Sequence, residues 1–343
     1  MKMIYVASLS HKPDRDTGWI YSFENLGLKV IPFSSELTIN RNNLIERILY
    51  RLHIGCRYTK LQRKLLDLID FEKPQWIHFR LPIEFGRKTI QAIQKKGIIV
   101  TEYFNDDPFS NKSPIGIYWK FISALSYYDA HYVYRISNIE EFKDYGGKVV
   151  YHCPPAYDPR RHYIPCLDSS KIKSDAAFIG HWEDDWRIDC LAALAKKGFK
   201  IIIKGGGWDI PLNNSILSNL CPVSHAFGQE YNQIYSGTIA GLCFFSKINR
   251  DMWTERALEI IAVGGVLVCE RTEEAEKYFQ DRIEAFFFSS INELVSIVSE
   301  LKSNPTLRES VKKNGFNRLL KSKNTISDRA KLVYDFVTNQ INN

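Results

Sequence analysis

The sequence lacks several features that define large classes of proteins. It contains no run of 18 or more apolar residues, so it predicts no membrane-spanning helix. The N-terminal stretch MKMIYVASLSHKPDR becomes charged before the core of a signal peptide could form. The seven cysteines are scattered without a C-x-x-C pair, which is typical of reduced thiols. We therefore expect a cytoplasmic protein, or one peripheral to the inner membrane face, without a disulfide scaffold or zinc knuckle.

Bulk disorder is also excluded, because 45% of the 343 residues are hydrophobic and 25% are charged. The net charge of +7 is unevenly distributed. Residues 1–165 hold 24 Lys and Arg against 17 Asp and Glu, whereas residues 166–343 hold 22 of each. This asymmetry favours two domains with different partners. A basic half suits nucleic acid, an anionic membrane or a phosphorylated ligand.

Short apolar runs alternate with helical periods twice along the chain, which predicts an α/β protein with two Rossmann-like, doubly wound parallel-sheet domains. A loop is expected over 8–19, before a helix at 19–27, and helical periodicity covers 42–70. The proline-rich stretch 154–170 is the expected linker. The predicted organisation is an N-terminal domain (1–160), a C-terminal domain (161–326) and a C-terminal helix (327–343) that packs back on the first domain.

The segment TERALEIIAVGG predicts a buried helix that carries Arg256 and Glu259 near its start. Arginine offers a planar fork of donors to phosphate oxygens, and the first turn of a helix favours anions. A carboxylate can accept hydrogen bonds from two sugar hydroxyls. The two residues therefore suit the phosphate and ribose of a nucleotide. The alternative is a simple ion pair between residues three apart on one helical face.

Two further loops follow predicted strands. The first runs from Gly180 and His181 through the acidic residues 183–185 to Arg187, which could meet the same phosphates. The acidic residues suit helix capping better than a metal site. The second loop contains Lys204 and Gly205 and could take up a base or sugar, although a glycine triplet also suits a tight turn.

Several of these segments resemble a known family when taken in order. The resemblance rests on NDDP at 105–108, on the run from YYDAHYVYR to PPAYDP, on AAFIGHWEDDWR, on RALEIIAVGG and on NTISDRA. The chain resembles the GT-B glycosyltransferases, specifically the CgeB-like (spore-maturation protein) relatives of the group 1 enzymes. The similarity covers most of residues 98–330.

The resemblance implies roles for individual residues. Glu259 matches the carboxylate that binds the donor ribose, and Arg256 the arginine beside the diphosphate. Gly180 and Arg187 fall in the loop and helix that face the phosphates. Group 1 enzymes often carry an acidic residue eight positions earlier that faces the donor sugar, and here that position holds Asp251, which is one carbon shorter than glutamate.

The acceptor side is expected in the N-terminal half. The loop after the first strand holds His11, Asp14 and Asp16, any of which could accept the proton of an acceptor hydroxyl unless the loop is merely solvated. Asp106 and Asp107 end a later strand, where Asp107 is a further catalytic candidate. Their alternative role is an Asx turn before Pro108.

A basic amphipathic stretch provides a possible membrane contact. Arginines and lysines interleave with leucines and isoleucines at helical spacing over 41–64, which suits an anionic bilayer surface. The alternative is a helix packed on the core with a solvated basic face.

Together these observations predict a metal-independent glycosyltransferase without a cofactor. It would move a sugar from a nucleotide-diphosphate sugar to a glycan, lipid-linked or protein acceptor, in the synthesis of a cell-surface polysaccharide, glycolipid or glycoprotein. One alternative is a metal-dependent GT-A-type transferase that uses Asp106 and Asp107. The other is a noncatalytic nucleotide-sugar- or nucleic-acid-binding protein, although no nucleic-acid motif accompanies the basic half.

Overall fold

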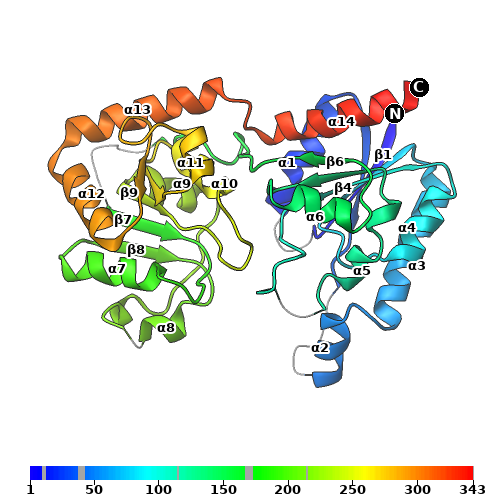
Figure 1. Cartoon of the computed structure of the whole chain (residues 1–343), viewed down its shortest axis with the longest axis horizontal. Coiled ribbons are helices and arrows are strands. Elements are labelled where there is room, and N and C mark those ends of the chain that lie inside the picture. Colours follow the sequence, from blue (N-terminus) through cyan, green and yellow to red (C-terminus); the bar gives the residue numbers. More distant parts are fainter. Residues whose placement is uncertain (10–12, 38–42, 114–115, 167–172, 214, 343) are drawn as a thin grey trace. The chain divides into compact units, whose positions relative to one another are not determined.

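The computed structural model describes residues 1–9, 13–37, 43–113, 116–166, 173–213 and 215–342, and the side chains of residues 13–15 are not described. The chain forms two compact units (Figure 1). Unit 1 comprises Met1–Pro154 and Ile326–Asn343, and unit 2 comprises Pro155–Thr325. All strand pairs of both units are parallel among the described residues. The predicted α/β class with two doubly wound sheets is therefore confirmed.

Unit 1 has a six-stranded sheet in the order β2-β1-β3-β4-β5-β6. Its strands are β1 (Lys2–Ala7), β2 (Lys29–Ser34), β3 (Trp76–Arg80), β4 (Ile99–Phe104), β5 (Ala130–Val133) and β6 (Val150–His152). Its helices are α1 (Pro13–Asn25), α2 (Leu44–Arg51), α3 (Cys56–Glu72), α4 (Arg87–Gln94), α5 (Trp119–Ile122), η1 (Leu125–Tyr127), α6 (Asn138–Asp144) and α14 (Ile326–Asn342).

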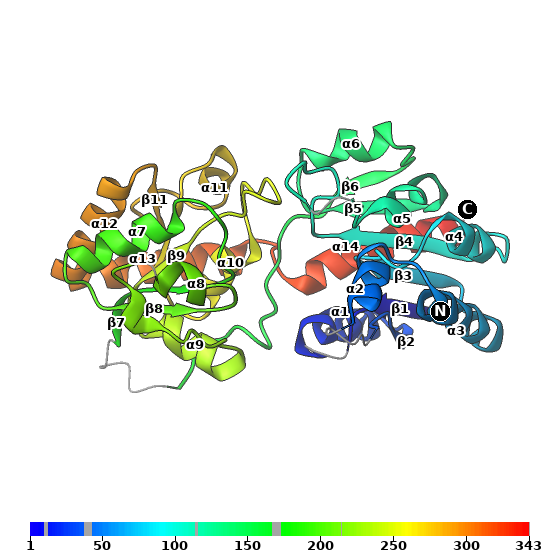
Figure 2. The same cartoon turned by 90° about the horizontal axis from the view of Figure 1, so that it is seen from below.

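Unit 2 has a five-stranded sheet in the order β11-β10-β9-β7-β8. Its strands are β7 (Ser174–Ile179), β8 (Ile201–Lys204), β9 (Thr238–Cys243), β10 (Leu267–Glu270) and β11 (Phe286–Phe288). Its helices are α7 (Arg187–Lys196), α8 (Asp209–Asn213), η2 (Ser218–Leu220), α9 (Gly228–Ser236), α10 (Glu255–Ala262), α11 (Glu273–Tyr278), α12 (Ile291–Ser303) and α13 (Pro305–Lys321). Figure 2 shows the same elements after a quarter turn.

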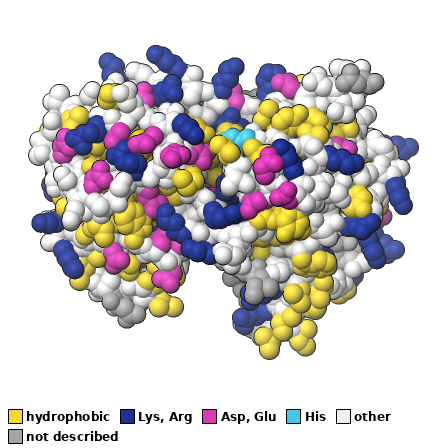
Figure 3. All heavy atoms as spheres, viewed as in Figure 1, with side chains coloured by type: hydrophobic (Ala, Val, Ile, Leu, Met, Phe, Trp, Pro, Cys, Tyr) yellow, Lys and Arg dark blue, Asp and Glu magenta, His cyan; other side chains and the backbone are white. Residues whose placement is uncertain are grey.

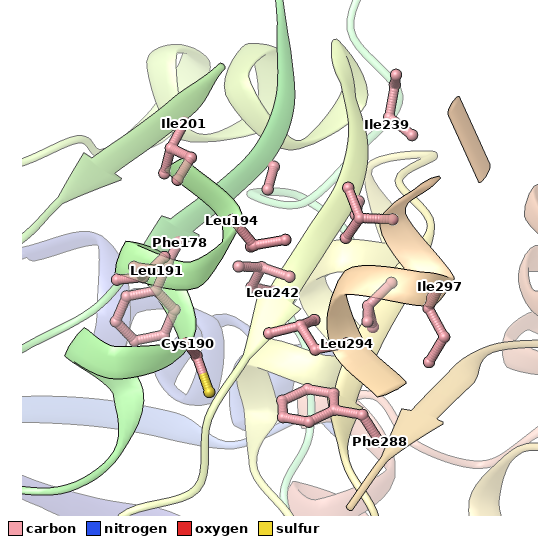
Figure 4. Packing of buried hydrophobic residues seen from close by; sticks show 14 of the residues in the cluster. Phe178, Cys190, Leu191, Leu194, Ile201, Ile239, Leu242, Phe288, Leu294 and Ile297 are labelled. Atoms are coloured by element: carbon pink, nitrogen blue, oxygen red, sulfur yellow. The ribbon is translucent and has the colours of Figure 1, made fainter. Parts of the chain in front are cut away.

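Both faces of each sheet are apolar. Successive side chains of a strand point to opposite faces, so a run of consecutive apolar residues covers both of them. In unit 2, Phe178 belongs to one buried cluster, whereas its neighbours Ala177 and Ile179 belong to the other. Figure 4 shows the first cluster, in which the sheet packs against α7 through Leu191 and against α12 through Leu294. Near-continuous apolar strands are what a sheet covered by helices on both faces requires, and this is why the strands were recognisable in the sequence.

Local chemistry sets several helix boundaries. The side chain of Ser290 accepts a hydrogen bond from the Glu293 N–H at the start of α12. Asn304 does the same for the Leu307 N–H at the start of α13, where Pro305 occupies the first turn.

Two predicted boundaries were wrong. The expected loop over 8–19 is already helical from Pro13, because proline is well tolerated in a first helical turn. The helical stretch 42–70 is two helices, since His53 and Gly55 between them take φ of 53° and 103°. The short strand β11 was missed, because three consecutive phenylalanines give no periodicity.

Candidate functional site

The carboxyl edge of the sheet in unit 2 gathers most of the predicted donor residues. β7 lies between β8 and β9. The chain passes from β7 to β8 on one side of it, and then crosses to β9 on the other side. Ligands of doubly wound sheets bind at such a switch point. The loop after β7, the loop after β8 and the start of α10 after β9 all emerge at this edge. Gly180, Gly205 and Arg256 come from these three segments.

Gly180 and Gly205 are in close contact through their backbones. Gly205 has a φ of +130°, and a Cβ atom there would lie 2.0 Å from the carbonyl oxygen of Gly180. A Cβ atom on Gly180 would lie 2.7 Å from the Phe178 ring and 2.9 Å from Nη2 of Arg256. The Gly180 N–H also donates to the Lys204 carbonyl at 2.9 Å. Only glycine at these positions lets the two loops and the arginine come together.

Arg256 is a guanidinium that forms no ion pair with the acidic residues in the described part of the chain. It lies over the Phe178 ring, with 5.2 Å between Cζ and the ring centroid, and Nη1 donates only a long 3.5 Å bond to the Phe244 carbonyl. Among the residues that the structure describes, no carboxylate lies within 4.0 Å of its nitrogens. Burial opposes its charge, but Cys243, Tyr235, Tyr231 and Glu259 nearby keep its pKa above the ordinary value. Arg256 therefore retains donors and a full charge for an anion.

Arg187 has the opposite environment. Its Nε and Nη2 form a bidentate pair with Asp185 at 2.7 and 2.8 Å, and Nη1 donates to the His181 carbonyl at 2.6 Å. Only 3% of the residue is exposed. Because its donors are used inside the protein, Arg187 holds the loop between β7 and α7 in shape.

Glu183 of that loop also has protein partners. Glu183 Oε2 accepts hydrogen bonds from the backbone N–H groups of Lys247 at 2.9 Å and Ile248 at 3.3 Å. These bonds tie the loop after β7 to the loop after β9.

Glu270, at the end of β10, is a buried residue that sequence reasoning missed. It accepts the indole N–H of Trp186 and, at 2.7 Å, the backbone N–H of Phe245. The only signal for it was a carboxylate ending the apolar run VLVCE. With Glu183, it fixes the segment that leads into α10.

Glu259 is held by two residues that the sequence analysis did not single out. Tyr231 donates its hydroxyl to Oε2 at 2.6 Å, and His162 Nε2 lies 3.3 Å from Oε1. Burial raises the pKa of Glu259. His162, the Tyr231 hydroxyl, Arg161 and Arg256 together lower it by more than burial raises it, so the pKa lies below its usual value. The carboxylate is thus charged at neutral pH and ready to accept hydrogen bonds.

Glu259 and Arg256 do not pair with each other, which removes the alternative of a simple ion pair along the helix. A signal for Tyr231 was present in its spacing from Tyr235, because residues four apart share one face of α9. Tyr235 accepts the Ile179 N–H at 2.9 Å at the end of β7. This face of α9 therefore supports both the strand and the carboxylate.

The remaining predicted donor residues surround this centre. Lys204 Nζ donates to Ser224 at 2.7 Å and pairs with Glu230 at 3.1 Å. The exposed His181 ring lies 6.2 Å from that of His225. Asp251 belongs to the loop between β9 and α10, where its N–H donates to the Ser246 carbonyl at 2.8 Å.

The predicted catalytic residues of unit 1 have structural partners or lie outside the described part. Asp16 is buried in α1, where Oδ1 accepts from Tyr5 at 2.9 Å and Arg80 at 2.8 Å. Asp107 is fully buried, and its Oδ1 accepts the Phe109 N–H at 3.1 Å and the Asn138 amide at 3.0 Å. The first of these bonds is the Asx turn considered as the alternative. His11 and the side chain of Asp14 lie outside the described residues.

The two parallel sheets with helices on both faces match the architecture of the GT-B class, and solved structures agree. Sucrose-phosphate synthase from Thermosynechococcus elongatus superposes with a TM-score of 0.70 at 11% identity, with 99% of each chain covered. HepE from Anabaena, in complex with UDP and glucose, gives 0.68 at 12% identity, covering 99% of this chain and 100% of that one. A glycosyltransferase from Rickettsia africae gives 0.64 at 12% identity, covering 100% and 99%. At these identities the likeness establishes the fold.

The sequence itself matches a family model over part of its length. Residues 187–335, from the start of α7 into α14, match the model of the glycosyl transferase-like family. No curated protein matches the chain. The family match over residues 187–335 and the GT-B fold support the predicted glycosyltransferase, and they favour it over the GT-A and noncatalytic alternatives.

Proposed function

We propose that unit 2 binds a nucleotide-diphosphate sugar, with the diphosphate on Arg256 and the first turn of α10 and the ribose on Glu259. The observation that carries this proposal is the half-buried Arg256 guanidinium, which has no carboxylate within ion-pair distance among the described residues. It faces Gly180 at the carboxyl end of β7. A half-buried guanidinium without a carboxylate partner in the described part of the chain is suited to bind an anionic ligand.

The proposed reaction is transfer of the sugar to an acceptor hydroxyl. The acceptor oxygen attacks the anomeric carbon, the bond from that carbon to the diphosphate oxygen breaks, and the acceptor proton passes to a base. Negative charge grows on the departing diphosphate. Arg256 and the backbone N–H groups at the start of α10 oppose that charge without a metal ion. Metal independence is supported by Glu183 and Asp185, which are engaged with protein partners.

The remaining assignments follow the same division. We propose that the domain of residues 161–326 binds the donor, with Asp251 nearest the transferred sugar, and that the domain of residues 1–160 binds the acceptor. The excess positive charge of residues 1–165 favours an anionic or lipid-linked acceptor over a neutral one. Within the group 1 enzymes, the order of motifs from NDDP to NTISDRA favours the CgeB-like type.

Nucleotide binding to Arg256→Ala tests the proposal. UDP is the first probe, because the structurally similar HepE was solved with UDP and glucose. Loss of charge-assisted bonds worth about 1.5–3 kcal/mol should weaken UDP binding roughly 10- to 150-fold in isothermal titration calorimetry. Glu259→Ala should weaken uridine and UDP alike, because the ribose is common to both.

Arg282→Ala is the matched control, since Arg282 pairs with Glu300 on the surface of the same unit. It should bind UDP like the wild type. GDP and ADP are tested in parallel, because Arg256 recognises the diphosphate whatever the base. Unchanged nucleotide binding by Arg256→Ala would refute the assignment. Sugar transfer that is lost in EDTA and restored by Mn²⁺ would refute metal independence.

A further inference from the structure

Helix α2 presents its apolar side to solvent, which is the reverse of an ordinary surface helix. Helical spacing places Leu44, Ile45, Ile48 and Leu52 on one side. Their exposed fractions are 64%, 68%, 50% and 39%, and α2 has no buried residue. A helix whose apolar side is left uncovered by the residues that the structure describes is expected to bury that side elsewhere.

The neighbouring α3 shows the contrast. Its apolar residues Tyr58, Leu61, Leu65 and Ile69 are all buried in unit 1. The basic stretch 41–64, which the sequence predicts to be one amphipathic helix, therefore consists of two helices that pack differently. The later part packs on the core, as the alternative hypothesis stated, whereas α2 stands away from the sheet beyond the bend at His53 and Gly55 (Figure 1).

Trp119 of α5 extends the apolar side of α2. Its indole Nε1 donates to the Leu52 carbonyl at 2.8 Å, which holds the ring beside the end of the helix, and 45% of the residue is exposed. We call Leu44, Ile45, Ile48, Leu52 and Trp119 the α2 patch. Figure 3 shows hydrophobic side chains gathered where Figure 1 places α2.

Positive charge borders the α2 patch. Arg47 and Arg51 lie on the side of α2 next to Leu44, and both are exposed. On α3, Lys60, Arg63 and Lys64 are exposed as well, while the single acid of α2, Glu46, pairs with Arg57 at 2.9 Å. An apolar side with Trp and Leu beside a basic side is the pattern of helices that lie in the interface of an anionic membrane. A second copy fits less well, because it would bring two basic surfaces together.

We propose that the α2 patch inserts into the surface of an anionic lipid bilayer, with Arg47 and Arg51 at the phosphate headgroups. The described part of the chain contains no helix able to cross a membrane, so the contact is one of lying on the surface. Insertion does not depend on sugar transfer. If both hold, unit 1 would meet an acceptor presented at the membrane.

Co-sedimentation of the full chain with vesicles tests the proposal. We compare vesicles of phosphatidylcholine with 30% phosphatidylglycerol against pure phosphatidylcholine. The wild type should bind the anionic vesicles at least tenfold more tightly, and binding should weaken at 1 M salt, where the screening length is about 3 Å. Ile45→Ser with Ile48→Ser, and separately Arg47→Gln with Arg51→Gln, should each reduce binding to anionic vesicles at least tenfold.

Phe71→Ser is the matched control, because Phe71 is 82% exposed in the same unit but lies at the far end of α3. It should bind vesicles like the wild type. All variants change exposed residues, so unchanged thermal unfolding and unchanged UDP binding would show that the fold and unit 2 are intact. Failure of UDP binding in the wild type would count against the proposed donor site and not against insertion.

Quenching by bromine-labelled lipids separates insertion from simple attraction. Trp119 should be quenched in the wild type, and Trp119→Phe should lose that quenching. Trp19, Trp76, Trp208 and Trp253 are buried, and Trp182 and Trp186 are half-buried against the core of unit 2. Three results would overturn the proposal. They are equal binding to neutral and anionic vesicles, vesicle binding by the Ile45/Ile48 variant equal to the wild type, and a wild-type dimer in sedimentation velocity that this variant dissociates.

Discussion

At the scale of single residues, unit 1 buries a neutral histidine inside its sheet. His78 on β3 is fully buried, and its Nδ1 lies 2.8 Å from the Thr101 hydroxyl on β4. The same hydroxyl oxygen accepts the Trp76 indole N–H at 2.8 Å. Burial, and to a smaller extent Arg80, lowers the pKa of His78 to about 3. The imidazole is therefore uncharged in the folded protein across the physiological range.

This burial predicts a pH dependence of stability. Below about pH 6.5 the unfolded chain protonates His78 and the folded protein does not, so the unfolded state binds more protons and stability falls as pH falls toward 3. We expect the free energy of unfolding of the wild type to decrease relative to His78→Gln by up to about 1.4 kcal/mol per pH unit. Urea unfolding at pH 7, 6 and 5 measures this difference.

The contributions of the other histidines to the pH dependence cancel when the wild type is compared with His78→Gln. His53, for example, also has a pKa lowered by burial, to about 4, and it is present in both proteins. Parallel pH profiles for wild type and variant would mean that His78 accepts a proton without unfolding.

At the scale of elements, the loop between β7 and α7 is ordered by one buried ion pair. The side chains of Arg187 and Asp185 are 4% and 8% exposed, and the Asp185 carboxylate also accepts the Arg187 backbone N–H at 3.0 Å. The pair sets where Gly180 and His181 lie relative to α7. It therefore sets the shape of the loop that borders the proposed donor site.

Removing one partner of this pair should be costly. Asp185→Ala leaves the buried Arg187 charge without its main partner, and we expect a loss of about 3–5 kcal/mol in the free energy of unfolding. Asp335→Ala is the control, because Asp335 forms an exposed pair with Lys331 four residues away on α14. That change should cost about 0.5 kcal/mol or less in urea unfolding. Equal effects of the two variants would contradict the role given to Asp185.

At the scale of the whole molecule, unit 1 is built from both ends of the chain. Helix α14 follows unit 2 in sequence but packs against α1 of unit 1. Val333 and Val337 of this helix are fully buried there, and Arg329 Nε donates to the Pro154 carbonyl at 2.8 Å. The stability of unit 1 therefore depends on residues that follow unit 2 in the sequence.

Adjacent residues of α14 give a direct test. Val333→Asp places a carboxylate in the core of unit 1, and we expect unit 1 to lose about 3 kcal/mol or more. Leu332→Asp, at a position that is 36% exposed, should change stability little. Calorimetry should show a lowered transition for unit 1 in the first variant, while the transition that UDP raises, assigned to unit 2, stays in place. An equal fall of both transitions would contradict the expectation that the two units unfold independently.

The sequence alone determined the class of fold and indicated a glycosyltransferase, because both depend on local patterns. Apolar runs between helical periods predicted every strand described here except β11, and the order of short motifs from NDDP to NTISDRA supported the resemblance to glycosyltransferases. Arg256 and Glu259 could be predicted as site residues for the same reason, since a charge near the start of an apolar helix is conspicuous in the sequence. The start of α1 and the break before α3 were missed, because proline and positive φ act within one or two residues.

Only the tertiary structure decided how each charged side chain is used. Arg187 and Arg256 are equivalent in the sequence, each near the start of a helix after a strand, yet one is paired with Asp185 and the other has no carboxylate partner among the described residues. Likewise α2 and α3 share one basic, amphipathic pattern, but in the described part of the chain α3 buries its apolar side and α2 does not. Partners such as Tyr231 and His162 for Glu259 come from distant segments, and periodicity within one segment carries no information about which segments meet.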